Sequence, residues 1–100
     1  MYYLYGMNSK MELSDVIAKA TTLDKAREKA YAYMELYGNI RIPKKPAVKA
    51  VYIYKDEDVV GYVQPNTRYA VSADYVWTTY DRRTGFTHKA LSKNGKIRRD

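Results

Sequence analysis

One segment of this 100-residue chain has a clear helical pattern, and it constrains the fold because most other runs favour β-structure. It begins at Thr21-Thr22-Leu23-Asp24, where a threonine hydroxyl can accept a hydrogen bond from an unpaired amide and an acid faces the positive end of the helix dipole. It ends at Gly38-Asn39, a usual helix terminator. Apolar residues recur at helical spacing, and we expect them to be buried: Leu23, Ala26, Ala30, Tyr33, Met34 and Tyr37. Charged residues mostly take the opposite side: Lys25, Arg27, Glu28, Lys29 and Glu35.

The runs on both sides of this helix predict β-strands. Residues 2–5 are aromatic and extended in character, and residues 12–20 follow without a clear period, so we favour a second strand there. After the helix, the runs 48–54 and 59–63 are separated by an acidic KDED tip, which is typical of a hairpin. Residues 75–80 and 86–91 flank DRRTG, which suits a type I turn followed by a left-handed residue. Residues 69–72 are a further candidate strand.

These elements predict an α+β fold. An antiparallel sheet of about five or six strands is covered on one face by a single main helix, in a ββαβββ-like order. The length suits one domain, 1–100, which buries enough surface to fold without disulfides or a structural metal. Its last part, 92–100, is a basic tail that is free to fray.

The absence of cysteine excludes a disulfide framework and a thiolate metal site, and it fits a reducing compartment. Met1 leads straight into YYLYG, with no basic region followed by a long apolar run. We therefore expect no signal peptide, no membrane partner and a cytoplasmic protein, in the host cytoplasm if a phage encodes it.

The net charge of +7 is unevenly distributed. Residues 1–40 hold five basic and five acidic side chains, so the whole excess lies in residues 41–100. Between Arg82 and Arg99 there are seven basic residues and no acid. Clustered cations concentrate polyanions, so this asymmetry indicates a nucleic-acid partner.

Aromatic residues are interleaved with these cations, and exposed rings give unpaired bases a stacking surface. The candidate phosphate contacts are Arg82, Arg83, Lys89, Lys93, Lys96, Arg98 and Arg99. The candidate stacking residues are Tyr75, Trp77, Tyr80 and Phe86. Alternation along a strand places these rings on opposite faces, and one face must be core. The same residues also suit a purely structural role, in which the aromatic side chains pack the sheet and the lysines keep the protein soluble.

The stretches VYIYKDEDVVGYV and YVWTTYDRRTGFTHKALSKNGK resemble the small uncharacterised accessory proteins of phages and prophages of Gram-positive bacteria. The resemblance spans about half the chain and consists of the strand, helix, hairpin, hairpin order and a YDR…TG turn. It implies a context in which such proteins bind nucleic acids or inhibit a host defence or replication factor. It assigns no functional residue.

Catalytic signals are weak. His88 is the one histidine and suits an acid–base role, but a lone histidine beside a turn is more typical of a surface residue. Asp56, Glu57 and Asp58 lack the further spaced ligands of a cation loop. We therefore expect no cofactor, no metal and no catalytic residue.

The leading hypothesis is a non-enzymatic protein with a basic, tyrosine-rich β surface that binds nucleic acid or a nucleoprotein. The first alternative is a protein-binding inhibitor of a host factor, for example an anti-CRISPR protein. The second is a small metal-independent ribonuclease toxin, which this chain resembles in size and basicity. The sequence leaves the oligomeric state open.

Overall fold

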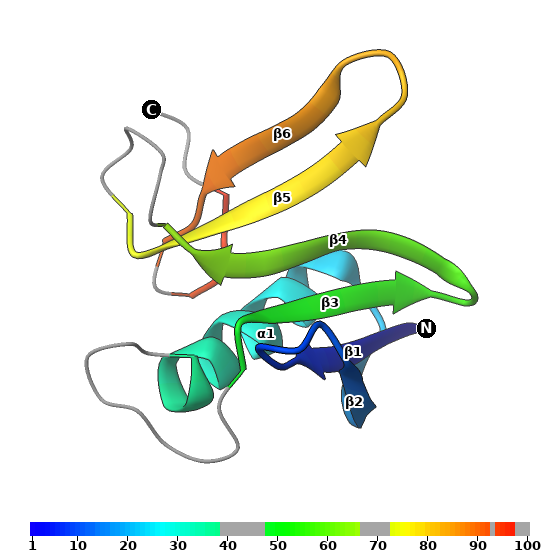
Figure 1. Ribbon diagram of the computed structural model, residues 1–100, viewed down its shortest axis with the longest axis vertical. Coiled ribbons are helices and arrows are strands. Elements are labelled where there is room, and N and C mark those ends of the chain that lie inside the picture. The colour runs from blue at the N-terminus through cyan, green and yellow to red at the C-terminus, as the bar shows by residue number, and fades with distance from the viewer. Residues whose placement is uncertain (39–47, 67–72, 93, 98–100) are drawn as a thin grey trace.

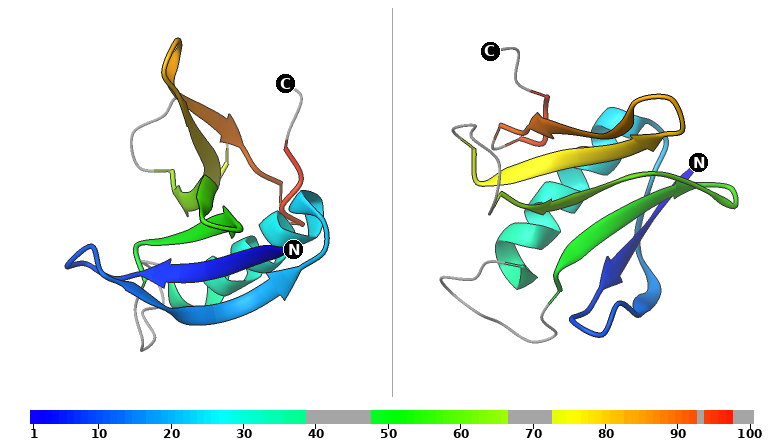
Figure 2. Two further views of the ribbon diagram at one scale, coloured as in Figure 1. Left: turned by 90° about the vertical axis from the view of Figure 1, so that its right-hand side faces the viewer. Right: turned by 45° about the horizontal axis from the view of Figure 1, so that its top comes forward.

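The computed structural model describes residues 1–38, 48–66, 73–92 and 94–97. Six strands form one antiparallel sheet in the order β2-β1-β3-β4-β5-β6, and one helix packs on a single face of it (Figures 1 and 2). The predicted α+β class is confirmed. The elements are β1 Tyr2–Met7, β2 Leu13–Ala20, α1 Leu23–Tyr37, β3 Ala50–Lys55, β4 Asp58–Pro65, β5 Tyr75–Asp81 and β6 Gly85–Ala90. The candidate strand at 69–72 lies outside the described residues.

The helix has the predicted caps. The Thr22 hydroxyl accepts a hydrogen bond from the Lys25 amide at 3.2 Å, and the Gly38 amide donates to the Met34 carbonyl at 2.8 Å. Ala30 and Met34, from the predicted apolar stripe, are fully buried. These caps satisfy amides and carbonyls that a helix end otherwise leaves unpaired.

Two helical residues lie deeper in the core than their periodicity predicts. Tyr31 packs edge-on against Tyr75, with ring centroids 5.0 Å apart. Arg27, expected on the polar side, is buried with its guanidinium 5.5 Å from the centroid of the Trp77 ring. The expectation for Arg27 was wrong because a long side chain can lie along an aromatic face and still reach an acid, here Asp24.

The β5–β6 hairpin has the predicted turn chemistry. The Asp81 carboxylate accepts a hydrogen bond from the Arg83 amide at 2.7 Å, and Gly85 has a φ of 78° in the left-handed region. Both features direct the chain back along β5, so Arg82 and Arg83 occupy the exposed tip.

Alternation along the strands divides the sheet into a helix-covered face and an open face. Leu4, Val51, Ile53 and Val63 point toward α1 and are fully buried. Their strand neighbours point to the open face, which no described helix covers (Figure 2). The main hydrophobic cluster therefore lies on the helix-covered side of the sheet.

The described part of the C-terminal tail packs on the helix-covered side. Leu91 pairs with Ile97 in an isolated bridge, and Gly95 lies against the backbone of Arg27 and Glu28 in α1. In Figure 2 this red segment runs beside the N-terminal turns of the helix. Tail residues 94–97 are therefore part of the packed domain.

Candidate functional site

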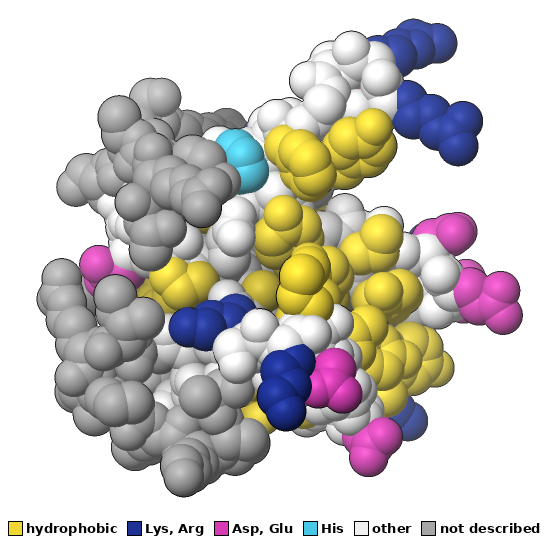
Figure 3. Space-filling view, viewed as in Figure 1, with side chains coloured by type: hydrophobic (Ala, Val, Ile, Leu, Met, Phe, Trp, Pro, Cys, Tyr) yellow, Lys and Arg dark blue, Asp and Glu magenta, His cyan; other side chains and the backbone are white. Residues whose placement is uncertain are grey.

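The open face of the sheet carries half of the chain's tyrosines. Strand alternation opposite the buried residues Leu4, Ile53 and Val63 assigns them to this face. In the view of Figure 3, hydrophobic side chains gather over its middle. The tyrosines of this face are Tyr3, Tyr5, Tyr52, Tyr54, Tyr62 and Tyr80.

A groove of about 520 Å³ lies on this face between β3–β4 and the β5–β6 hairpin. In the described chain, eight large hydrophobic residues are exposed, and four of them line this groove. Exposed apolar side chains that gather in one hollow indicate a binding surface more than scattered ones do. The lining residues are Met11, Tyr52, Val59, Val60, Gly61, Tyr62, Thr78, Thr79, Tyr80 and Phe86.

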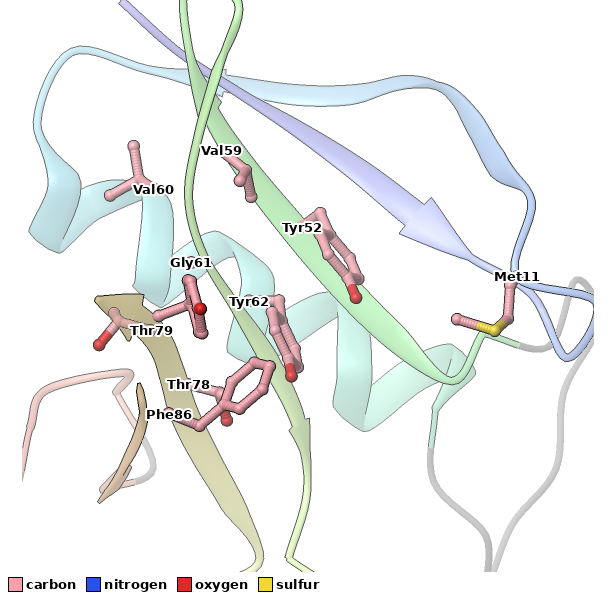
Figure 4. Close-up of a pocket in the computed structure, with 10 residues that line it drawn as sticks. Met11, Tyr52, Val59, Val60, Gly61, Tyr62, Thr78, Thr79 and Phe86 are labelled. Carbon is pink, nitrogen blue, oxygen red and sulfur yellow. The ribbon is translucent and has the colours of Figure 1, made fainter. Parts of the chain in front are cut away.

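The aromatic side chains of the groove form a row across the strands. Figure 4 shows Phe86 beside Tyr62 and, further along, Tyr52, with Met11 at the far end. The Tyr52 and Tyr62 rings are stacked, with centroids 4.6 Å apart and planes 13° from parallel. Phe86 also contacts Tyr80, with centroids 5.0 Å apart. The row joins β3, β4 and the β5–β6 hairpin into one aromatic surface.

The pKa of the Tyr52 phenol lies above its ordinary value. Burial raises the pKa of Tyr52, and the neighbouring hydroxyls of Tyr62 and Tyr54 raise it further. A neutral phenol both donates and accepts hydrogen bonds. The stacked pair therefore offers two hydroxyl groups as well as its outer ring faces.

A chain of three polar side chains lies at one side of the groove. Gln64 donates from its amide nitrogen to the Thr78 hydroxyl at 3.0 Å, and that hydroxyl lies 2.9 Å from Nδ1 of His88. The Thr78 hydroxyl has one proton and two lone pairs, so it can bind the imidazole while it accepts from Gln64. The chain holds the imidazole in a defined orientation on the open face.

Charge of opposite sign lies at two neighbouring hairpin tips. Arg82 and Arg83 project from the β5–β6 tip, and Asp56, Glu57 and Asp58 from the β3–β4 tip. Both groups are exposed, and Figure 3 shows basic and acidic side chains projecting separately on the same side of the view. Antiparallel pairing of β3 to β6 places both tips at the same end of the sheet, one basic and one acidic.

Two predicted stacking residues prove to be core. Tyr75 is 5% exposed and Trp77 is 4% exposed, and the Tyr75 hydroxyl donates to the Met34 carbonyl at 3.3 Å. They are buried because their side chains point to the helix-covered face, where Tyr75 contacts Met34 and Trp77 contacts Arg27. Tyr80 and Phe86 are 64% and 60% exposed, and both line the groove. The accessible rings are therefore those near the hairpin tip.

The predicted phosphate contacts that the structure describes do not gather on one surface. Arg82 and Arg83 lie together at the hairpin tip, but Lys89 pairs in register with Trp77 and so points to the helix-covered side of β6. Lys96 belongs to the tail that packs on α1. Lys93, Arg98 and Arg99 lie outside the described residues.

The sequence interpretation missed Tyr52, Tyr62 and Met11 as candidates for the site. The signal for Tyr52 was present in VYIY, where Val51 and Ile53 alternate with aromatics that must then share the opposite face, and Tyr62 precedes Val63 in the next strand in the same alternation. Met11 carried no such signal, because its place depends on the turn between β1 and β2.

Comparisons with protein-family models, curated proteins and solved structures found nothing that matches this chain. Within the described residues, no group of three or more histidine, cysteine or acidic side chains is placed to hold a metal ion. The described helix is too short and too polar to cross a bilayer.

Proposed function

We propose that this protein is a non-enzymatic, phage-type accessory protein that binds nucleic acid or a nucleoprotein through the open face of its sheet. The observation that carries the proposal is the aromatic groove beside the arginine-tipped hairpin. Exposed rings stack on bases, and arginines neutralise phosphates and release counterions.

The composition of the face supports this function. Phe86 and Tyr80 each keep more than half of their surface exposed, although burying such rings would stabilise the domain. The +7 charge of the chain attracts polyanions and adds to the effect of the two arginines at the tip of the β5–β6 hairpin. A face with these two features is well suited to a ligand that has flat rings and negative charge.

The test is fluorescence anisotropy with labelled oligonucleotides of mixed sequence at two salt concentrations. Replacing Arg82 and Arg83 with alanine should weaken binding similarly for every sequence. The slope of log affinity against log salt should fall by roughly one to two units, because each lost phosphate contact removes about one. The matched control replaces Lys25 and Lys29, on the helix, with alanine. It removes the same charge far from the groove and should leave most of the slope intact.

Lack of micromolar binding by the unmodified protein at low salt would contradict the proposal. The alternative partner is a host protein, since tyrosine-rich faces also occur at protein interfaces. A pull-down from host lysate with and without nuclease separates the two, because a nuclease-resistant host protein would favour an inhibitor.

The non-enzymatic part of the proposal has its own test. His88 is oriented by the Thr78 hydroxyl, which is not an acid–base group at neutral pH, and Lys89 points away from it. We expect no cleavage of labelled RNA, with or without Mg²⁺. Specific cleavage that disappears in His88→Gln would instead identify a ribonuclease.

A further inference from the structure

We propose that the ligand is a single strand, with unpaired bases in the aromatic groove and phosphates on the side of the β5–β6 hairpin tip. This inference rests on the proposed function and adds the state and orientation of the nucleic acid. It follows from two independent features, the row of rings and the distribution of charge around it.

The row of rings requires access to base faces. Phe86, Tyr62 and Tyr52 present their rings side by side across the sheet, within a hollow of about 520 Å³ (Figure 4). In a duplex every base face is covered by its neighbours, so a groove of this kind gains nothing from its rings unless the strands separate. Unpaired bases can turn outward and stack on aromatic side chains.

The polar groups of the groove suit bases as well. The half-buried side chains of Tyr52 and Tyr62 carry phenol hydroxyls. Base edges present donors and acceptors that such groups can meet. An entirely apolar groove would not offer these contacts.

The charges at the two hairpin tips set the orientation. Arg82 and Arg83 attract phosphates at one tip, whereas Asp56, Glu57 and Asp58 repel them at the other. Both tips are exposed to solvent. At moderate salt the electrostatic field of an exposed charge is screened beyond about 8–10 Å. The backbone of a bound strand therefore lies on the arginine side, and the bases point toward Tyr62 and Tyr52.

The experiment compares single-stranded and duplex oligonucleotides of one sequence, as DNA and as RNA, by fluorescence anisotropy. We expect single strands to bind at least tenfold more tightly than the matching duplexes. Phe86→Ala should weaken single-strand binding by roughly 5- to 150-fold, the range for one lost stacking contact, and leave duplex binding nearly unchanged. Leu36→Ala is the control, because Leu36 is an exposed apolar residue on the helix and should change neither affinity.

The orientation is tested with charge variants at the two tips. Asp56→Asn combined with Glu57→Gln should strengthen single-strand binding about two- to fivefold at low salt, and Arg82→Ala should weaken it by a similar factor. Both effects should shrink as salt rises. Loss of affinity in the acidic-tip variant would overturn the orientation.

The outcomes separate this inference from the proposed function. Equal affinity for duplex and single strand, with no effect of Phe86→Ala, would overturn the single-strand inference while nucleic-acid binding stood. Absence of binding to every oligonucleotide would overturn both. Circular dichroism of each variant, compared with the unmodified protein, shows that a loss of affinity is not a loss of fold.

Discussion

Replacing Gly95 with alanine should destabilise the protein more than the same replacement at Gly85. Both glycines have a φ of 78°, where a Cβ atom is unfavourable. They differ in their surroundings, because a Cβ at Gly85 would meet nothing within 4 Å. At Gly95 it would lie 2.6 Å from the Cα of Glu28 and 2.7 Å from the carbonyl oxygen of Arg27. The pair therefore isolates the contact between the tail and the helix.

The magnitudes follow from two effects. In Gly85→Ala the left-handed backbone costs about 1–2 kcal/mol, and reduced freedom of the unfolded chain returns about 0.4–1 kcal/mol, so the net loss is about 1 kcal/mol. In Gly95→Ala the same loss applies, and overpacking against helix backbone adds about 1–3 kcal/mol. The total for Gly95→Ala is therefore about 2–4 kcal/mol.

Urea unfolding gives the free energy of unfolding of each variant, and thermal unfolding gives its midpoint. Tryptophan fluorescence follows both transitions. Trp77 is the one tryptophan and is buried in the core, so its emission reports loss of the fold. The thermal midpoint should fall further in Gly95→Ala than in Gly85→Ala, by about 4–8 °C for each extra kcal/mol in a domain of this size. Free energies that agree within about 0.5 kcal/mol, the scatter of neutral surface changes, would refute the packing of the tail on α1.

Three further predictions concern the helix. Thr22→Ala should lower the free energy of unfolding by about 1 kcal/mol in urea titrations, because the Lys25 amide loses its acceptor, and Thr22→Ser should restore most of it. Ala30→Asp should cost several kcal/mol by placing a charge in the core, and an unchanged thermal midpoint would show that another helix face is buried. Burial, with a smaller effect of Glu35, raises the pKa of Tyr31 to about 12 from 10.0. Between these pH values the unfolded chain releases this proton before the folded protein does, so the free energy of unfolding should fall by on the order of 1 kcal/mol per pH unit in urea titrations at successive pH values. The same slope in Tyr31→Phe would show that Tyr31 is not the cause.

The local elements of this protein were predictable from its sequence. The Thr22 cap, the terminating Gly38 and the turn at Asp81 to Gly85 all act within a few residues, so their patterns predicted the helix and the hairpin correctly. The strand at Leu13–Ala20 was correctly favoured over a helix. Its hydrophobic period is poor because it is an edge strand with mostly exposed side chains. Fold class followed from the order of these elements.

Only the tertiary structure decided which aromatics are accessible. Tyr75, Trp77 and Tyr80 lie on one strand and look alike in sequence, but the first two point to the helix-covered face and the third points to the open face. The stacked pair of Tyr52 and Tyr62 depends on the cross-strand register of β3 and β4. Alternation along one strand shows which side chains share a face, whereas the helix that covers the sheet determines which of those faces is buried.

The tertiary structure also decided which charged side chains share a surface. The acid-free run from Arg82 to Arg99 is continuous in sequence, yet strand alternation turns Lys89 to the far side and the tail carries Lys96 onto the helix. Among the described cations of this run, Arg82 and Arg83 remain together at the hairpin tip. Sequence proximity predicts shared surface only along a single exposed element, because each strand alternates its side chains and each turn redirects the chain.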